Sequence, residues 1–440
     1  MSKIEKYINK RLLVCIISMI LILLKMNYFN NIFLIMAIII MSISIIVDTR
    51  ENKPIYLFFM LPLIYVMKFS NGQISMYNVL VMIYLMSMIY IYIKESIRIK
   101  PFIFLGLLII ITLVNSLTNE QFDIASYIGW ILNIIVLYFI IEETKDIEIY
   151  RRYSYYFALS MAIVGICGII FMNHTNIGTY LYNMRRTNTV LTGGKLNYRY
   201  CGFDLDPNYF ALQSLIAFWS VMVTNKVKSK YDYVLLAALI IVGLSTISKM
   251  YIITLVITSI IYFLLNIKNI KRMSIKKTVM TVAIILLIMT ISKEYILPVF
   301  ETRIEKIETV EDLTTGRSEI WKKYIEYISN NIKVVLIGEG IGVPYLNNQA
   351  SHNTYILLIY RLGIIGTGIF ILLVCSIIKT NKKIKICSIY SIPFLVFIIT
   401  NCALDIFDFD CFIYMLILVL GIYRINEPKK EVEDENKKSI

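Results

Sequence analysis

The chain has 440 residues, of which 58% are hydrophobic and only 17% are charged, and its mean hydropathy is +0.70. So few charged residues cannot cover the surface of a soluble globule of this size, which excludes that class and indicates an integral membrane protein. The seven cysteines contain no CxxC pair and therefore indicate neither a disulfide framework nor a metal centre, and the net charge of +14 must be explained by its distribution along the chain.

Apolar stretches long enough to cross a bilayer recur along the whole chain. A spanning helix needs roughly 20 mostly apolar residues. The first stretch, Leu12 to Leu24, lacks an A-x-A-like cleavage site and is interpreted as a retained span rather than a signal peptide. By this rule the sequence predicts about fourteen spans, at residues 12–27, 31–47, 54–70, 76–93, 101–118, 124–141, 153–172, 207–225, 232–247, 249–266, 278–294, 353–378, 386–404 and 411–424.

Lysine and arginine lie mainly in alternate connections between these spans. Basic residues favour the cytoplasmic side of a membrane, so the alternation explains the positive charge without nucleic-acid binding and predicts cytoplasmic N- and C-termini. The expected fold is an all-α polytopic membrane protein with a single transmembrane domain, residues 1–425, and a disordered cytoplasmic tail, residues 426–440. Two long polar loops, at about 173–206 and 295–352, are then extracytoplasmic, and both histidines, His174 and His352, lie in them.

The first external loop ends in a sequence typical of a helix start. Asp206 can accept hydrogen bonds from free backbone N–H groups as an N-cap, and Pro207 at the first helical position has no N–H to leave unpaired. Arg199 lies seven residues upstream, so the positive end of the helix dipole and a guanidinium together favour an anion site. The alternative is an ordinary Asp-Pro cap with an arginine that reaches lipid headgroups.

The second external loop contains a predicted amphipathic helix that begins near Arg317. Helical spacing places one apolar face on it, formed by Ile320, Trp321, Tyr324, Ile325 and Ile328. Such a helix lies on the membrane or over a cavity. For Arg317 the simplest interpretation is an ion pair with a nearby glutamate. The glycines of "GEGIG" that follow have no βαβ context, so they predict a tight turn rather than a dinucleotide site.

His352 directly precedes a predicted span, so the positive end of that helix dipole faces it. This position disfavours the imidazolium form, and a neutral imidazole can accept a proton. Asn353 or Ser351 is expected to cap the helix.

Two further polar features lie near the last spans. Arg361, nine residues beyond His352, falls on the opposite face of a straight helix and deeper in the membrane, and the sequence does not identify its partner. The turn that contains Asp405, Asp408 and Asp410 is interpreted as solvated, because it lacks the glycine and the terminal glutamate of a calcium loop.

Five motifs occur in a characteristic order over about residues 195–375: "RYCGFDLDPN", "LSTISK" between two spans, "TTGRSEIW", "GEGIG" and "SHNTYILLIYRLGIIG". Together they resemble the O-antigen ligase and O-antigen polymerase (Wzy-type) superfamily of bacterial polytopic glycosyltransferases, which use polyprenyl-diphosphate-linked glycans. The first seven predicted spans match this superfamily only in hydropathy.

The resemblance implies roles for individual residues. Arg199 and Arg317 would hold the donor diphosphate, and His352 would be the active-site histidine. Asp206, Asn208 and Asn353 are the further substrate-binding candidates. Lys249 stands where the superfamily usually has arginine. Lysine keeps the positive charge but lacks the guanidinium fork that binds two phosphate oxygens, which puts a diphosphate-binding role for Lys249 in doubt. Arg361 stands where an acidic residue is common.

The implied function is a polymerase of lipid-linked oligosaccharide repeat units at the outer face of the bacterial plasma membrane. No metal and no cofactor is required, and the implied partners are membrane lipids, a chain-length regulator and a flippase. The second interpretation is a ligase that transfers glycan to lipid A core, wall polymer or protein. The third is a transporter or flippase, which the few charges within the spans and the absence of a visible repeat disfavour.

Overall fold

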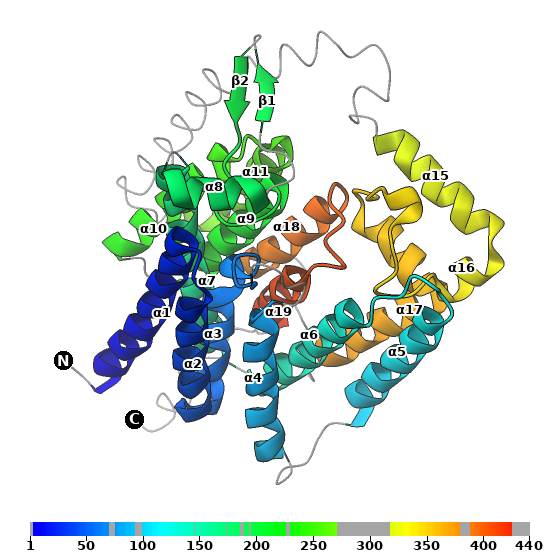
Figure 1. Cartoon of the computed structure of the whole chain (residues 1–440), viewed down its shortest axis with the longest axis horizontal. Coiled ribbons are helices and arrows are strands. Elements are labelled where there is room, and N and C mark those ends of the chain that lie inside the picture. Colours follow the sequence, from blue (N-terminus) through cyan, green and yellow to red (C-terminus); the bar gives the residue numbers. More distant parts are fainter. Residues whose placement is uncertain are drawn as a thin grey trace, which may run out of the picture.

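The structure is a computed structural model of the chain, and it describes residues 3–69, 75–92, 99–144, 146–172, 174–184, 189–192, 195–225, 229–270, 317–378 and 388–424. It is predominantly helical (Figure 1). Among the described residues, five helices are long and apolar enough to cross a membrane, which supports the prediction of a membrane protein. They cover Lys10–Tyr28, Ile124–Glu143, Ile147–Phe171, Lys249–Asn266 and Thr354–Ile378.

The first part of the chain folds into seven α-helices and two short 3-10 turns. These elements are α1 (Lys3–Tyr28), α2 (Asn31–Val47), η1 (Arg50–Asn52), α3 (Lys53–Met60), η2 (Leu61–Leu63), α4 (Tyr77–Tyr92), α5 (Ile99–Leu117), α6 (Ile124–Glu143) and α7 (Ile147–Phe171).

The remaining described elements include a two-stranded antiparallel hairpin, which stands apart from the helices in Figure 1. They are α8 (Thr175–Met184), β1 (Thr189–Thr192), β2 (Lys195–Tyr198), α9 (Pro207–Thr224), α10 (Lys230–Ser245), α11 (Lys249–Ile270), α15 (Arg317–Asn330), α16 (Ile332–Ile337), η4 (Leu346–Asn348), α17 (Thr354–Ile378), η5 (Ile389–Ser391), α18 (Ile392–Asn401) and α19 (Asp410–Arg424).

Most predicted spans coincide with a helix, but two differ and a third is not among the described residues. The span predicted at 54–70 is shorter, because α3 ends at Met60 and Pro62 lies in the 3-10 turn that follows, where it cannot donate to a regular helix. The span predicted at 386–404 contains a helix only from Ile392 to Asn401, and the span at 278–294 lies outside the described residues. The first predicted external loop contains α8 and the hairpin.

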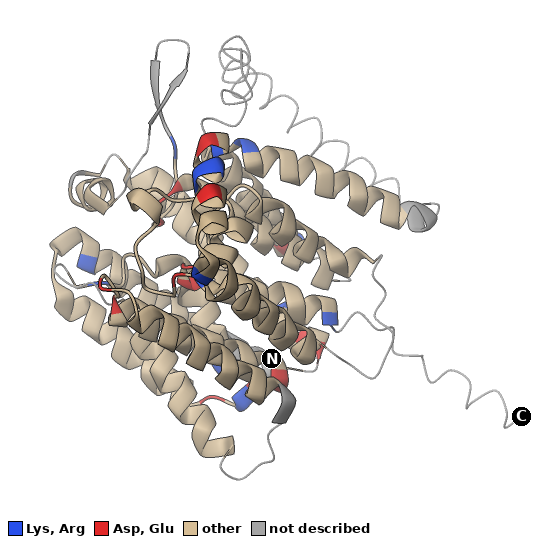
Figure 2. Ribbon diagram, turned by 90° about the vertical axis from the view of Figure 1, so that its right-hand side faces the viewer, with Lys and Arg blue, Asp and Glu red and all other residues tan. Residues whose placement is uncertain are grey.

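Helix α9 lies at the centre of the molecule. It packs against α7, α10, α18 and α19, and nearly all its side chains are buried. Helices α1, α2, α5, α11 and α17 instead expose large apolar side chains, as expected for surfaces that contact lipid. Figure 2 shows long stretches of helix without charged residues. The N-terminus of α9, where the site described below lies, is therefore held by a rigid core.

Helix α17 is broken at Gly363, whose φ of +62° interrupts the helical backbone. The break leaves carbonyl groups of α17 without hydrogen-bond donors from the same helix. Backbone N–H groups of the "GEGIG" turn bind these carbonyls instead. The backbone N–H of Glu339 donates to the carbonyl of Tyr360 at 2.7 Å, and that of Gly340 donates to the carbonyl of Arg361 at 3.0 Å. The predicted tight turn is confirmed, with positive φ at all three of its glycines.

Replacing Gly363 with alanine is expected to lower the free energy of unfolding by more than about 1 kcal/mol. A Cβ at this position would lie 2.4 Å from the backbone nitrogen of Ile337, and the positive φ disfavours an L side chain. The control is Gly368→Ala in the same helix, where a Cβ meets nothing within 4 Å and a gain of about 0.5–1 kcal/mol is expected. Thermal unfolding in detergent measures both, and equal midpoints for the two variants would contradict the prediction.

Candidate active site

The N-terminus of α9 is capped as the sequence predicts. The Asp206 carboxylate accepts the backbone N–H of Asn208 at 2.6 Å, and Pro207 occupies the first turn. Tyr209, in the first turn of α9, is buried. The helix therefore presents the positive end of its dipole, together with Asp206, to the chain segments around it.

Arg199 is fixed beside this helix start. Its Nη2 donates to Oδ1 of Asn208 at 2.9 Å, and its Nε donates to the carbonyl of Thr246 at 2.9 Å. The Ser248 hydroxyl donates to the same Asn208 oxygen at 3.0 Å. Lys249 follows as the first residue of α11. Arg199 and Asn208, two predicted site residues, are thus joined to the connection between α10 and α11, directly after which Lys249 lies in the chain.

His352 lies beside a buried carboxylate. Its Nδ1 is 3.8 Å from Oδ1 of Asp405, whose side chain is 0% exposed, whereas the imidazole is 38% exposed. The hydroxyl of Tyr209 donates to the same Asp405 oxygen at 2.8 Å. The backbone of His352 has a φ of +51°, which is unusual for a residue other than glycine and is concentrated at functional sites. An accessible imidazole therefore lies next to a buried carboxylate from another part of the chain.

Burial lowers the pKa of His352 below its ordinary value of 6.5, and the Arg317 cation lowers it further, while Asp405 and Asp206 act in the opposite direction. Burial raises the pKa of Asp405, against the effects of His352 and Tyr209. The imidazole is therefore neutral at physiological pH. Asp405 lies on the Nδ1 side of the ring, at a distance longer than a direct hydrogen bond.

Arg317 reaches the same place from the start of α15. Its Nη1 donates to the carbonyl of Ala403 at 2.8 Å, two residues before Asp405. Burial lowers the pKa of this guanidinium, and Asp405, Asp206 and Tyr209 raise it, so that it remains charged. Most of the nearby glutamates lie outside the described residues, so the expected pairing of Arg317 with a glutamate stays a prediction. Arg317 and His352 thus interact electrostatically with the same two carboxylates, Asp405 and Asp206.

The predicted amphipathic helix is present as α15, and it holds the segment that leads to His352. The indole N–H of Trp321 donates to the carbonyl of Ser351 at 2.9 Å, and the Tyr324 hydroxyl donates to that of Gln349 at 2.8 Å. The prediction that Ile325 belongs to the apolar face is wrong, because this side chain lies about a quarter turn from Tyr324 and is 56% exposed. Tyr327 packs against the core instead.

Asn353, predicted to bind substrate, is the N-cap of α17. Its side-chain oxygen accepts the backbone N–H groups of Tyr355 and Ile356 at 3.0 and 3.2 Å, and its amide donates to the carbonyl of Cys402 at 3.3 Å. Of the two predicted capping candidates, Asn353 rather than Ser351 is therefore the side chain that caps α17. A substrate contact by Asn353 remains a prediction.

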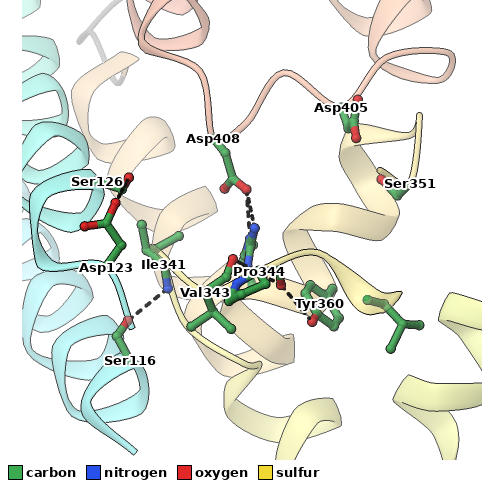
Figure 3. A network of polar contacts seen from close by, with 12 residues as sticks. Ser116, Asp123, Ser126, Ile341, Val343, Pro344, Ser351, Tyr360, Asp405 and Asp408 are labelled. Atoms are coloured by element: carbon green, nitrogen blue, oxygen red, sulfur yellow. Dashed lines mark hydrogen bonds and ion pairs between the residues drawn. The ribbon is translucent and has the colours of Figure 1, made fainter. Parts of the chain in front are cut away.

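The turn between α18 and α19 was expected to be solvated, and this is wrong for its carboxylates. Asp405 is buried, and Asp408 pairs with Arg361 through Nε at 2.9 Å and Nη2 at 2.6 Å; Figure 3 shows the positions of these two carboxylates. Asp410 accepts a hydrogen bond from the Asn133 amide at 2.6 Å. The available signal was the apolar residues between them, since Leu404, Ile406 and Phe407 are almost fully buried and carry the carboxylates inward. Asp405 is the candidate site residue that the sequence analysis missed.

His174, the other histidine, lies outside the site. Its side chain is exposed, and its ring packs edge-on against Phe171 in the connection between α7 and α8. Two groups therefore lie around the start of α9: Arg199 with Asn208, and His352 with Asp405 and Arg317, to which Tyr209 of α9 is hydrogen-bonded through Asp405. In comparisons with known proteins, no family model, no curated protein and no solved structure matches this chain.

Proposed function

We propose that this chain is a membrane glycosyltransferase that polymerises lipid-linked oligosaccharide repeat units and belongs to the O-antigen ligase and polymerase superfamily. The observation that supports the proposal is the position of His352, whose accessible neutral imidazole lies against the buried Asp405 and within electrostatic range of the Arg317 cation. A base beside a guanidinium suits a reaction in which a hydroxyl loses its proton while an anionic group departs.

In the proposed step, an acceptor sugar hydroxyl attacks the anomeric carbon of a glycan attached to polyprenyl diphosphate. The new glycosidic C–O bond forms as the bond between the anomeric carbon and the diphosphate oxygen breaks, and the diphosphate leaves with the electron pair. The hydroxyl proton passes to the imidazole of His352 and then to water. Arg317 and Arg199 offset the charge that grows on the leaving diphosphate, which stabilises the transition state more than the bound substrate. These protein groups supply both the base and the electrophilic stabilisation, so we propose that transfer requires no metal ion.

The proposed topology has about fourteen spans, with both termini in the cytoplasm and the site at the outer face of the bacterial plasma membrane. It follows from the distribution of lysine and arginine and from the lengths of the apolar stretches. Cysteine labelling from outside tests it. A cysteine introduced at Gln349, in the exposed segment before His352, should react with an impermeant maleimide in intact cells, and a cysteine introduced at Lys230 should react only after lysis.

The activity can be tested with purified protein in nanodiscs and lipid-linked repeat units isolated from cells that lack the gene. Glycans of increasing length on the lipid, formed in the presence of EDTA, are the expected products. Transfer only to a non-lipid acceptor would indicate a ligase instead. No transfer to any acceptor, combined with movement of lipid-linked glycan across sealed vesicles, would indicate a transporter and overturn the proposal.

Replacing Arg317 with lysine is expected to reduce the rate of transfer about 10-fold or more, because lysine keeps the charge but loses the fork that binds two phosphate oxygens at once. Initial rates of chain extension at saturating donor measure the effect. Arg151, which forms an exposed ion pair with Glu148 in α7, provides the control, and Arg151→Lys should leave the rate unchanged. A rate for Arg317→Lys equal to that of the native protein would remove Arg317 from the mechanism.

A further inference from the structure

A polar cavity of about 660 Å³ lies beside the candidate active site. Its walls come from α4, α6, the segment before α4 and the start of α19. A cavity of this size is typical of sites that bind small molecules. Figure 3 shows two of the groups that line it, Asp123 on the α6 side and Asp408 on the connection between α18 and α19.

Polar atoms without partners line this cavity. Trp130 is 5% exposed and Asn133 is 1% exposed, yet within the described part of the chain the indole Nε1 and the Asn133 Oδ1 have no hydrogen-bond partner. The same is true of Oδ1 of Asn78 and Oδ1 of Asp408. Buried polar groups are normally paired, and an unpaired group disfavours the folded state. These atoms are themselves almost inaccessible, but their side chains line the cavity, and they comprise one donor and three acceptors that a ligand with both kinds of group, such as sugar hydroxyls, would pair.

The charge and shape of the lining also favour a sugar over a phosphate. Asp123, Asp408 and Asp410 line the cavity together with Lys68, and Asp408 is paired with Arg361, so the lining keeps an excess of one carboxylate. The neighbouring site instead contains Arg199 and Arg317. A negative excess repels phosphate. The rings of Tyr65, Phe122 and Trp130 add flat apolar surfaces, against which the C–H faces of a pyranose can pack.

The cavity is connected to the catalytic candidates through short contacts. The ring of Phe409, in the cavity wall, lies 4.7 Å from that of Tyr209, whose hydroxyl donates to Asp405 behind His352. We propose that this cavity binds an uncharged sugar unit of the acceptor glycan. The proposal rests on the proposed glycosyltransferase function, to which it adds a subsite and the chemical class of its ligand.

The test compares two tryptophans. Trp130→Phe removes the unpaired indole N–H in the cavity. Trp219→Phe removes an equally unpaired, buried indole N–H in α9, where Trp219 packs on Phe218 and Tyr262 outside the cavity. In extension assays at saturating donor, Trp130→Phe should raise the KM for the acceptor about 3- to 10-fold with little change in kcat, which corresponds to one lost hydrogen bond. Trp219→Phe should leave both unchanged, and equal KM values in both variants and in the native protein would overturn the proposal.

A binding measurement keeps the inference independent of catalysis. The probe is the reducing oligosaccharide released by mild acid from the cells' own lipid-linked glycans, and the signal is the fluorescence of Trp130, obtained as the difference between native protein and Trp130→Phe. Saturable quenching by the oligosaccharide and none by inorganic pyrophosphate is the expected result. Quenching by pyrophosphate or by phospholipid headgroups alone would overturn the sugar assignment. Oligosaccharide binding by a protein that shows no transfer would retain the cavity assignment and reject the polymerase function.

Discussion

Replacing His352 with alanine is expected to lower the rate of glycan transfer by about 10²- to 10⁴-fold, the contribution of a positioned general base. The protein should remain folded, because the imidazole is 38% exposed and its neighbour Asp405 keeps the hydroxyl of Tyr209 as a partner. Chain extension by the purified variant in nanodiscs measures the rate, and the thermal unfolding midpoint reports the fold.

His174 provides the matched control, because it is the other histidine of the chain and its side chain is exposed. His174→Ala should retain the full rate. In the native protein the rate should fall as the pH decreases below the pKa of His352, since protonation removes the base. Because burial and Arg317 lower this pKa below 6.5, the fall should begin at more acidic pH than for a free histidine. Full activity of His352→Ala, or an acidic limb that persists in it, would contradict the assignment.

Replacing Arg361 with methionine is expected to reduce the free energy of unfolding by about 3–5 kcal/mol, the usual effect of breaking a buried ion pair. The Arg361 side chain is 3% exposed, and it donates to Asp408 and to the carbonyl of Val343. Without it, the Asp408 carboxylate remains largely buried and uncompensated. Denaturation in mixed detergent micelles measures the loss.

The double variant Arg361→Met with Asp408→Leu should recover a large part of this stability, because it removes both charges together. Arg151→Met breaks an exposed pair with Glu148 in α7 and should change stability by no more than about 1 kcal/mol. If Arg361→Met lost no more stability than Arg151→Met, the pair between Arg361 and Asp408 would not stabilise the fold.

Hydropathy predicts helices well in this chain, because a continuous apolar run has few other ways to satisfy its backbone in a membrane. The span predicted at 31–47 coincides with α2, and the span predicted at 76–93 coincides with α4 within one residue at each end. Breaks within apolar runs are less predictable. Gly363 interrupts α17 only because a distant segment, the "GEGIG" turn, supplies the missing hydrogen bonds.

In the candidate site, too, contacts between residues close in sequence are predictable, whereas contacts between distant residues are not. The caps by Asp206 and Asn353 follow from the sequence because they involve neighbouring residues. The role of Asp405 could not be identified in this way, because 53 positions separate it from His352, and its burial depends on packing between α17 and the connection after α18. The partner of Arg361 was missed for the same reason, since Asp408 is 47 positions away.

The connection between α18 and α19 carries three carboxylates with three different partners: Asp405 faces His352, Asp408 binds Arg361, and Asp410 binds Asn133 at the cavity. An insertion of one residue between Asp405 and Asp408 would shift these carboxylates relative to each other and disturb at least one of their pairs. We therefore expect relatives of this chain to keep the intervals from Asp405 to Asp408 and from Asp408 to Asp410.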